Sequence, residues 1–122
     1  MIKELLVIFI GGGLGSMLRY GISRWTGIHP TGFPLATFLT NMLACLMLGI
    51  IWAYINKNGE TPQVYGLLLM TGFCGGFSTF STFGIETVNL IQQGNLALAL
   101  VYVSASVILG TSILILAIRL MS

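Results

Sequence analysis

The sequence predicts an all-α integral membrane protein with four transmembrane helices, folded as a single membrane domain over residues 1–122. Of the 122 residues, 56% are hydrophobic and only 7% are charged, whereas soluble domains carry roughly 25% charged residues. Four apolar segments come near the roughly 20 residues that a helix needs to cross a bilayer, and the alternating pattern of a membrane β-barrel is missing. The expected spans cover about residues 5–25, 34–54, 63–91 and 96–120.

The few ionisable residues argue against several classes of function. Five basic and three acidic residues give a net charge of +2, and they are too few and too scattered to bind nucleic acid. Cys45 and Cys74 lie in apolar segments without CxxC spacing, so we expect packing residues and not metal ligands. The chain has one histidine and no aspartate, so an enzyme is not expected.

The first span is rich in glycine and carries one arginine. Gly11 and Gly15 are four residues apart and form a small face, which lets another helix approach closely. The GGGLGS run lacks the preceding strand and the Lys-Ser/Thr ending of a phosphate-binding loop, so nucleotide binding is not expected. Arg19 lies near the end of the span, where it would reach the interface, make a structural pair or contact an ion.

The second and fourth spans each carry polar residues on one face. Thr37 and Asn41 are four residues apart in the second span. An asparagine at this depth needs partners, which are either a neighbouring helix or an anion bound by its NH₂ group. In the fourth span, Tyr102 and Ser106 are four residues apart, and Gly110 continues the same stripe. Both spans therefore offer polar groups inside the bundle.

The third span contains the stretch TGFCGGFSTFSTFG, residues 71–84, which is expected to break the helix at membrane depth. Glycines and hydroxyl residues weaken a helix, and loose backbone persists in a membrane only where protein or a watery cavity satisfies it. We place the break near residues 75–79, with the interruption at Gly75–Gly76. Free carbonyls on the incoming half-helix suit a cation such as Na⁺, and free N–H groups on the outgoing half suit an anion.

Aromatic and hydroxyl residues alternate after the expected break. Phe77, Phe80 and Phe83 recur every three residues, a spacing that is usually a packing stripe. The interleaved hydroxyls belong to Ser78, Thr79, Ser81 and Thr82. Ring edges carry the positive side of the quadrupole, so rings and hydroxyls together suit an anion without a fixed positive charge, which favours passage over trapping. These residues alone indicate a small ion-conducting dimer, with fluoride as one option.

The polar positions gather toward one end of the expected bundle. If the N-terminus lies on side A, both termini and the second loop lie there, and the first and third loops lie on side B. The polar residues of the spans then fall in the B half, so one subunit carries half of a polar path. Positive residues near the span ends differ between the sides by only one or two, so neither orientation is strongly favoured. We therefore expect an antiparallel, dual-topology homodimer.

Three motifs extend this interpretation: GGGLGSMLRY near the start, FPLATFLTN entering the second span and TGFCGGFSTFSTF in the third. With them, essentially the whole chain resembles the Fluc (CrcB-type) fluoride channel family. The resemblance implies an antiparallel homodimer with two fluoride pathways and a structural Na⁺ on its two-fold axis, bound by backbone carbonyls at Gly75 and Ser78. It also implies passive export of fluoride across the bacterial inner or plasma membrane, in which the chain would be a multi-pass protein.

The resemblance also implies roles for individual side chains. Phe80 and Phe83 match the aromatic box of the pore, and Asn41 matches the pore asparagine. The other positions implied along the fluoride pathway are Thr37, Ser81, Thr82, Glu86, Tyr102 and Ser106, together with Arg19 of the first span. Gly110 stands where some relatives have a serine, which leaves a fluoride contact there open.

The main alternative is a proton-coupled exporter of the small multidrug resistance type, which is also short, four-spanned and antiparallel. Such an exporter needs a carboxylate deep in the membrane. The first span has none beyond Glu4, and the position of Glu86 late in the third span indicates a vestibule or a pairing with Arg19. A further alternative is a subunit that only takes part in assembly and conducts no ion. In that case the Phe-Ser-Thr repeat would form a polar interface with another helix.

Overall fold

The structure, a computed structural model, describes residues 1–59 and 61–122. Glu60, which the sequence places in the second loop, lies outside the described residues. Four helices in the described part of the chain are long and apolar enough to cross a membrane, as predicted, and the third consists of several shorter segments. The elements are α1 (Ile2–Thr26), α2 (Leu35–Asn58), α3 (Gln63–Tyr65), the π-helix η1 (Gly66–Cys74), α4 (Gly75–Phe77), α5 (Phe80–Gln92) and α6 (Leu96–Met121).

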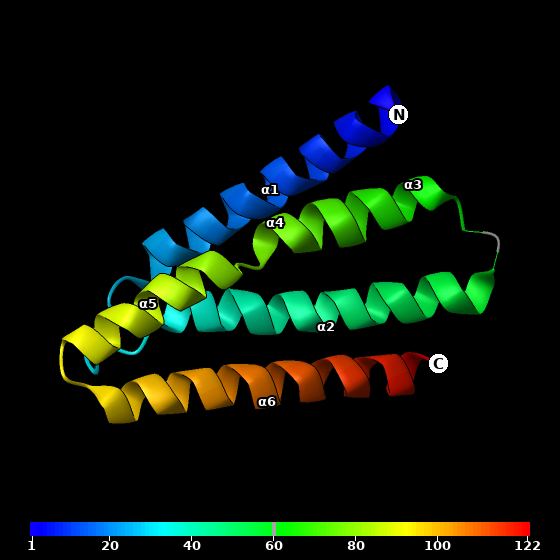
Figure 1. Ribbon diagram of the computed structural model, residues 1–122. Coiled ribbons are helices and arrows are strands. Elements are labelled where there is room, and N and C mark those ends of the chain that lie inside the picture. Colours follow the sequence, from blue (N-terminus) through cyan, green and yellow to red (C-terminus); the bar gives the residue numbers. More distant parts are fainter. Residues whose placement is uncertain (60) are drawn as a thin grey trace.

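Successive long segments run in opposite directions (Figure 1). The helix α1 and the segment from α3 to α5 run toward one end of the molecule, and α2 and α6 run back. Both termini and the connection between α2 and α3 lie together at one end, while the other two connections lie at the opposite end. The end with the termini is side A of the sequence prediction, and the opposite end is side B.

Glycines and asparagines set the ends of α1 and α2. Gly27 after α1 and Gly59 after α2 have φ values of 62° and 58°, a backbone conformation that glycine adopts without a steric penalty. Near the end of α2, the Asn56 and Asn58 side chains donate to carbonyls one turn earlier, at 2.8 and 2.9 Å. These bonds support the polar end of the helix, which follows Ile55.

The glycine face of α1 packs directly against η1 and α4, as its spacing predicts. A β-carbon at Gly11 would collide with the Leu68 carbonyl oxygen, and one at Gly15 would collide with the Phe73 carbonyl oxygen. A β-carbon at Gly76 would in turn strike the backbone of α1. Backbones therefore touch here, because only hydrogen occupies the side-chain positions.

The third span bends where the chain leaves the helix at Ser78 and Thr79. Both residues are extended, with φ and ψ of −77° and 158° for Ser78 and −153° and 118° for Thr79. These two residues lie within the predicted range 75–79, but the interruption expected at Gly75–Gly76 is wrong, because both glycines belong to the helical turn α4. The physical reason is packing: the lack of a side chain at Gly76 serves the close approach of α1 and not a change of backbone direction.

The helices α2 and α6 pack side by side through two further glycines. A β-carbon at Gly49 would lie 2.7 Å from the Ala117 Cβ, and one at Gly110 would lie 3.2 Å from Met42 Cε and 3.4 Å from Cys45 Sγ. Gly110 is thus buried in the α2–α6 contact. Its small size has a packing role in the single chain.

The main buried cluster lies toward side B and joins α5 to α6. It consists of Leu90, Ala99 and Tyr102, with Phe33, Phe38, Phe83 and Leu98 packed against it. Many other large apolar side chains are exposed in the single chain, including Phe9 at 77% and Phe80 at 83%. In a membrane such surfaces face lipid or another polypeptide chain.

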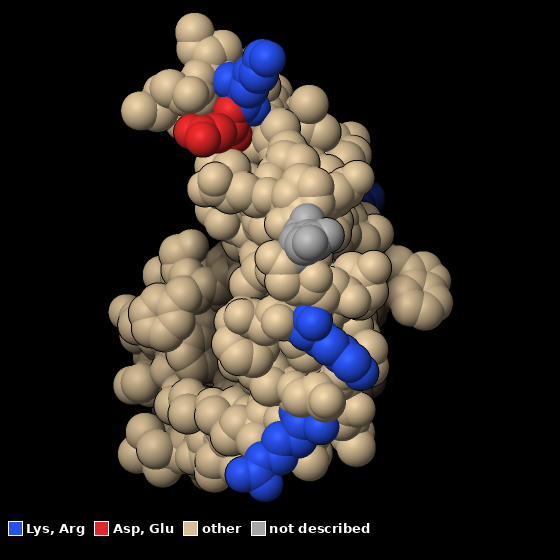
Figure 2. Space-filling model, turned by 90° about the vertical axis from the view of Figure 1, so that its right-hand side faces the viewer, with Lys and Arg blue, Asp and Glu red and all other residues tan. Residues whose placement is uncertain are grey.

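Charged side chains are spread over side A at the ends of three helices (Figure 2). Lys3 lies in the first turn of α1, Lys57 in the last turn of α2 and Arg119 in the last turn of α6. On side B, the last turn of α1 carries Arg24. The difference in positive charge between the two ends is small, so the positive-inside rule gives little preference for one orientation.

Candidate functional site

Side-chain hydrogen bonds replace helical ones at the break in the third span. Thr79 directly precedes α5, and its Oγ1 accepts from the Thr82 N–H at 3.2 Å and donates to Thr82 Oγ1 at 3.0 Å. On the other side of the break, the N–H and the hydroxyl of Ser78 both donate to the Cys74 carbonyl at 2.9 Å. Thr79 is therefore the N-cap of α5, a role that a hydroxyl just before a helix often fills.

The side chain of Asn41, in α2, binds both the backbone N–H and the backbone carbonyl of Thr79. Its Nδ2 donates to the Thr79 carbonyl at 3.2 Å, and its Oδ1 accepts from the Thr79 N–H at 2.8 Å. The side chain thus supplies partners that the interrupted helix no longer provides. The sequence predicts that Asn41 binds either a neighbouring helix or an anion. The bond to the neighbouring span is present, and Nδ2 keeps a second hydrogen that an anion could accept.

The hydrogen bonds accepted by the Asn41 and Thr79 side chains engage two amide N–H groups that would otherwise bind carbonyls of the break. In a continuous α-helix, the Gly75 carbonyl would accept from the Thr79 N–H, which donates here to Asn41. The Ser78 carbonyl would accept from the Thr82 N–H, which donates here to the Thr79 side chain. Gly75 and Ser78 are the two positions expected to bind Na⁺, and free carbonyl oxygens suit such a cation.

A cavity of about 240 Å³ opens beside the break, between α2, α5 and α6. Its lining residues are Asn41, Met42, Cys45, Ser78, Thr79, Phe80, Phe83, Ser106 and Val107. The ring centroids of Phe80 and Phe83 lie 5.7 Å apart. The Ser106 hydroxyl oxygen is buried and has no hydrogen-bond partner in the part of the chain that the structure describes. Because an unpaired buried hydroxyl costs about 1–3 kcal/mol, this position calls for a water molecule or an anion.

Glu86 of α5 accepts two hydrogen bonds from two other helices. Thr37 Oγ1 donates to Oε1 at 2.8 Å, and the Tyr102 hydroxyl donates to Oε2 at 2.7 Å. Thr37 and Tyr102 are only 5% and 0% exposed. The Phe83 ring lies 5.0 Å from the Tyr102 ring, centroid to centroid. The predicted positions on α2, α5 and α6 thus form one connected group that reaches from the break toward side B.

Arg19 lies on the α1 side of the break. Its Nε donates to the Gly76 carbonyl at 3.3 Å. Arg19 and Glu86 both line a cavity of about 310 Å³, together with Thr82. No ion pair joins the two charges among the residues that the structure describes. Of the two interpretations of Glu86, the pairing with Arg19 is not formed among the described residues, because the guanidinium binds backbone and the carboxylate binds hydroxyl groups.

The two hydroxyl residues of α5 that are expected along the pathway, Ser81 and Thr82, do not line the same cavity. Thr82 is half-buried and faces the cavity that it shares with Arg19. Ser81 is exposed, with its Oγ 3.4 Å from Thr79 Oγ1. In the single chain, Ser81 therefore contributes little to either cavity.

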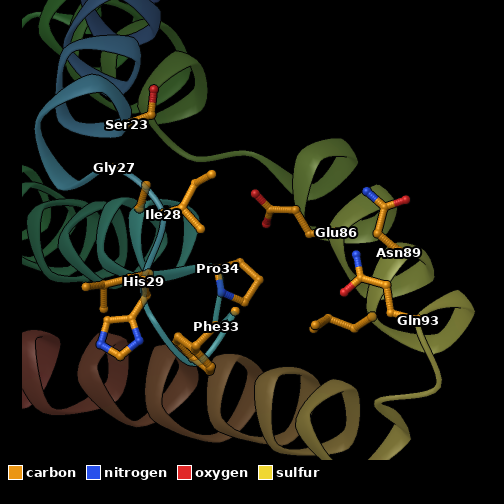
Figure 3. Close-up of a pocket in the computed structure, with 13 residues that line it drawn as sticks. Ser23, Gly27, Ile28, His29, Phe33, Pro34, Glu86, Asn89 and Gln93 are labelled. Carbon is orange, nitrogen blue, oxygen red and sulfur yellow. The ribbon is translucent and has the colours of Figure 1, made fainter.

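A cavity of about 330 Å³ opens at side B, between the first loop and α5 (Figure 3). Glu86 and Asn89 of α5 line it together with Gln93, which directly follows α5, and His29 and Phe33 line it from the loop. This vestibule agrees with one of the two interpretations of Glu86. The sequence analysis did not single out Asn89 and Gln93, although their positions three and seven residues after Glu86 place them on the same helix face.

Comparisons with known proteins agree with this geometry. The family described as "CrcB-like protein, Camphor Resistance (CrcB)" matches residues 6–118. The chain is 50% identical over 103 residues to the fluoride-specific ion channel FluC 2 of Bacillus subtilis, covering 84% of this chain and 76% of that protein. It is 40% identical over 109 residues to the fluoride-specific ion channel FluC of Flavobacterium psychrophilum, covering 88% of both.

A third relative is matched over nearly its full length. The fluoride-specific ion channel FluC of Pyrococcus abyssi is 41% identical over 117 residues, covering 94% of this chain and 93% of that protein. The family match over residues 6–118 includes the break in the third span and the residues around it. This chain belongs to the CrcB-like family.

Proposed function

We propose that this chain forms a fluoride-specific ion channel in the bacterial inner or plasma membrane, through which fluoride leaves the cytoplasm passively. The observation that carries the proposal is the unpaired, buried Ser106 hydroxyl in the cavity that Phe80, Phe83 and Asn41 also line. These side chains supply a hydroxyl, an amide hydrogen and ring edges, all of which favour an anion. Relatives that match most of the chain carry the name fluoride-specific ion channel.

The size and charge of fluoride suit this cavity. A small, hard anion keeps a tight hydration shell, so close donors must replace its water molecules. Among the described residues, no Lys, Arg or His lines this cavity, so the lining offers no fixed cation that would trap the ion. Conduction needs binding that is strong enough for entry and weak enough for exit.

The pathway continues from the cavity toward side B. Phe83 contacts Tyr102, and Tyr102 contacts Glu86, which lines the vestibule. The carboxylate of Glu86 repels an anion, but its two oxygens are each bound by a hydroxyl from another helix. The proposed pathway of one subunit therefore covers the B half of the membrane.

An antiparallel second copy would supply the other half. Phe80 is 83% exposed in the single chain although it stands beside the cavity, so a partner that covers this surface would enclose the cavity. The nearly even distribution of basic residues between the two ends supports insertion in both orientations. We propose a dual-topology homodimer with two fluoride pathways.

The break offers a fitting place for a structural Na⁺ on the two-fold axis of that dimer. The carbonyls of Gly75 and Ser78 lose their usual helical donors to Asn41 and Thr79, and Gly75 is exposed in the single chain. Two such carbonyls from each subunit would form a compact oxygen site. When bound, the ion would link the subunits and add positive charge near the anion pathway.

Fluoride efflux from proteoliposomes tests the proposal. Vesicles loaded with potassium fluoride should release fluoride when valinomycin lets K⁺ leave as well and balance the charge. Matched vesicles loaded with potassium chloride should release far less chloride. Strict dependence of the efflux on a proton gradient would contradict the channel and support the proton-coupled exporter of the small multidrug resistance type.

A matched pair of variants tests the aromatic contact. Phe80→Ile removes a ring beside the cavity and should strongly lower the fluoride flux. Phe9→Ile removes a ring that is exposed to a similar extent on α1, away from the break, and should leave the flux unchanged. Wild-type flux in a folded Phe80→Ile dimer would rule out ring-edge coordination.

A further inference from the structure

The carbonyl of Gly76, next to the proposed Na⁺ ligands, is bound by another helix. Ser16 Oγ and Arg19 Nε, both from α1, donate to this carbonyl at 3.3 Å. The neighbouring carbonyls of Gly75 and Ser78 lose their usual helical donors, as described above. The side chains of α1 therefore bind the Gly76 carbonyl, and none of their hydrogen bonds among the described residues goes to the carbonyls of Gly75 and Ser78.

The Gly76 carbonyl needs the donors Ser16 and Arg19 because the break removes its usual helical partner. In a continuous helix, the Gly76 carbonyl would accept from the Phe80 N–H, but the extended residues Ser78 and Thr79 lie between them. The carbonyl end of a helix also carries partial negative charge, which a guanidinium offsets. A hydrogen bond from a charged donor is roughly twice as strong as a neutral one. Arg19 is thus the stronger of the two α1 donors.

The contact between α1 and the break is a close one between backbones. Gly76 approaches α1 so closely that a β-carbon on it would lie 2.9 Å from the Gly12 Cα. Arg19 is half-buried, and its Nε has the Gly76 carbonyl as a partner. The Arg19 side chain is therefore bound to the break. It does not line the cavity between Phe80, Phe83 and Ser106, but lines the separate cavity that it shares with Thr82 and Glu86.

We propose that Arg19, assisted by Ser16, is a positioning residue for the break and not a ligand of the conducted ion. It holds the Gly76 carbonyl against α1 and so fixes the orientation of the adjacent peptide groups, which leaves the Gly75 and Ser78 carbonyls available to a cation. The link to Na⁺ rests on the proposed function, whereas the link to the geometry of the break does not.

Hydrogen–deuterium exchange of the purified protein in lipid nanodiscs tests the positioning role. Arg19→Gln should accelerate exchange of the amides in residues 75–82 by about tenfold, and Ser16→Ala by a smaller factor, because each removes one bond to the same carbonyl. Arg24→Gln and Ser23→Ala are the matched controls on the same helix, since Arg24 is exposed in the last turn and Ser23 donates only within α1. Both controls should leave this exchange unchanged.

A second readout separates positioning from ion contact. In Arg19→Gln, the Na⁺ concentration that gives half of the thermal stabilisation by Na⁺ should rise by about tenfold, while the fluoride concentration for half-maximal flux should stay at the wild-type value. Unchanged exchange in residues 75–82, or a raised fluoride half-saturation with unchanged Na⁺ dependence, would overturn the proposal. If Arg19→Gln does not fold, Ser16→Ala decides by the same criteria. Absence of fluoride flux in the wild type would refute the proposed function, and the exchange result would still decide the role of Arg19.

Discussion

At the scale of single residues, polar side chains in this chain have two distinct kinds of environment. Asn41 and Thr79 have their hydrogen-bonding groups engaged with the backbone of the break. The Ser106 hydroxyl oxygen is buried and has no hydrogen-bond partner among the described residues. The first kind stabilises an irregular backbone, and the second offers a vacant hydrogen bond. Their substitutions should therefore change different properties.

Replacing Asn41 should destabilise the protein. Asn41→Leu keeps the approximate size but leaves the N–H and the carbonyl of Thr79 without partners, which should lower the free energy of unfolding by at least about 2 kcal/mol. Unfolding in detergent, followed by circular dichroism, measures this change. Asn56→Leu on the same helix is the control, because Asn56 is exposed and bonds only to its own helix; it should stay within about 0.5 kcal/mol of wild type. Equal stability of the two variants would contradict a stabilising role of the hydrogen bonds between Asn41 and Thr79.

Replacing Ser106 should lower conduction without lowering stability. Ser106→Ala removes a hydroxyl that makes no hydrogen bond in the described chain, so the unfolding temperature should be equal to or above the wild-type value. The fluoride flux should fall several-fold, because a donor is lost from the cavity. Ser104→Ala changes an exposed hydroxyl on the same helix and should alter neither quantity. A wild-type flux in Ser106→Ala would exclude the hydroxyl from the pathway.

At the scale of elements, the glycine face of α1 determines how closely the first span approaches the broken third span. At Gly15, a β-carbon would lie 2.7 Å from the Phe77 amide nitrogen and would also collide with the Phe73 carbonyl oxygen. Both obstacles are backbone atoms, so a side-chain rotation cannot relieve the overlap. Separation of the two helices would also break the bonds from α1 to Gly76.

Two alanine substitutions on α1 should have opposite effects. Gly15→Ala should destabilise the protein by about 1–3 kcal/mol, because it forces the helices apart. Gly13→Ala, two residues earlier, has nothing within 4 Å of its β-carbon, and the higher helix propensity of alanine should leave the stability equal or slightly higher. The unfolding temperatures of the two purified variants measure the difference. A tolerated Gly15→Ala would contradict backbone contact between the helices.

At the scale of the whole molecule, a single chain leaves the proposed site open. Phe80 is largely exposed, and the connected group from Phe83 through Tyr102 to Glu86 reaches only side B. A second chain that covers this surface would enclose the cavity beside the break. An inverted copy would also extend the polar pathway through the A half of the membrane.

The orientation of the chain in native membranes tests the proposed dimer. Ser122→Cys places a thiol at the C-terminus on side A, while Cys45 and Cys74 lie within the apolar spans. A membrane-impermeant maleimide applied to spheroplasts should label about half of the Ser122→Cys molecules, and permeabilised membranes should label the rest. The wild-type chain is the control for background labelling. Labelling of either all or none of the molecules before permeabilisation would exclude dual topology.

The sequence by itself determined the four apolar helices, their order, the glycine face of α1 and the irregular third span. These features depend on local composition and on spacing within one helix, which the chain carries in every conformation. The candidate residues also followed from local signals, since hydroxyl, amide and aromatic groups are conspicuous in apolar segments. The motifs then identified the family on the same local basis.

The tertiary structure alone decided where the third span leaves the helix and which partners the polar groups choose. Asn41 and Thr79 are 38 positions apart, and Arg19 and Gly76 are 57 apart. Glycine composition placed the break at Gly75–Gly76, whereas long-range hydrogen bonds hold it at Ser78–Thr79. The reason is that a peptide group freed within a membrane must find a donor or acceptor on another helix, and only the packing of the helices determines which side chain lies within reach.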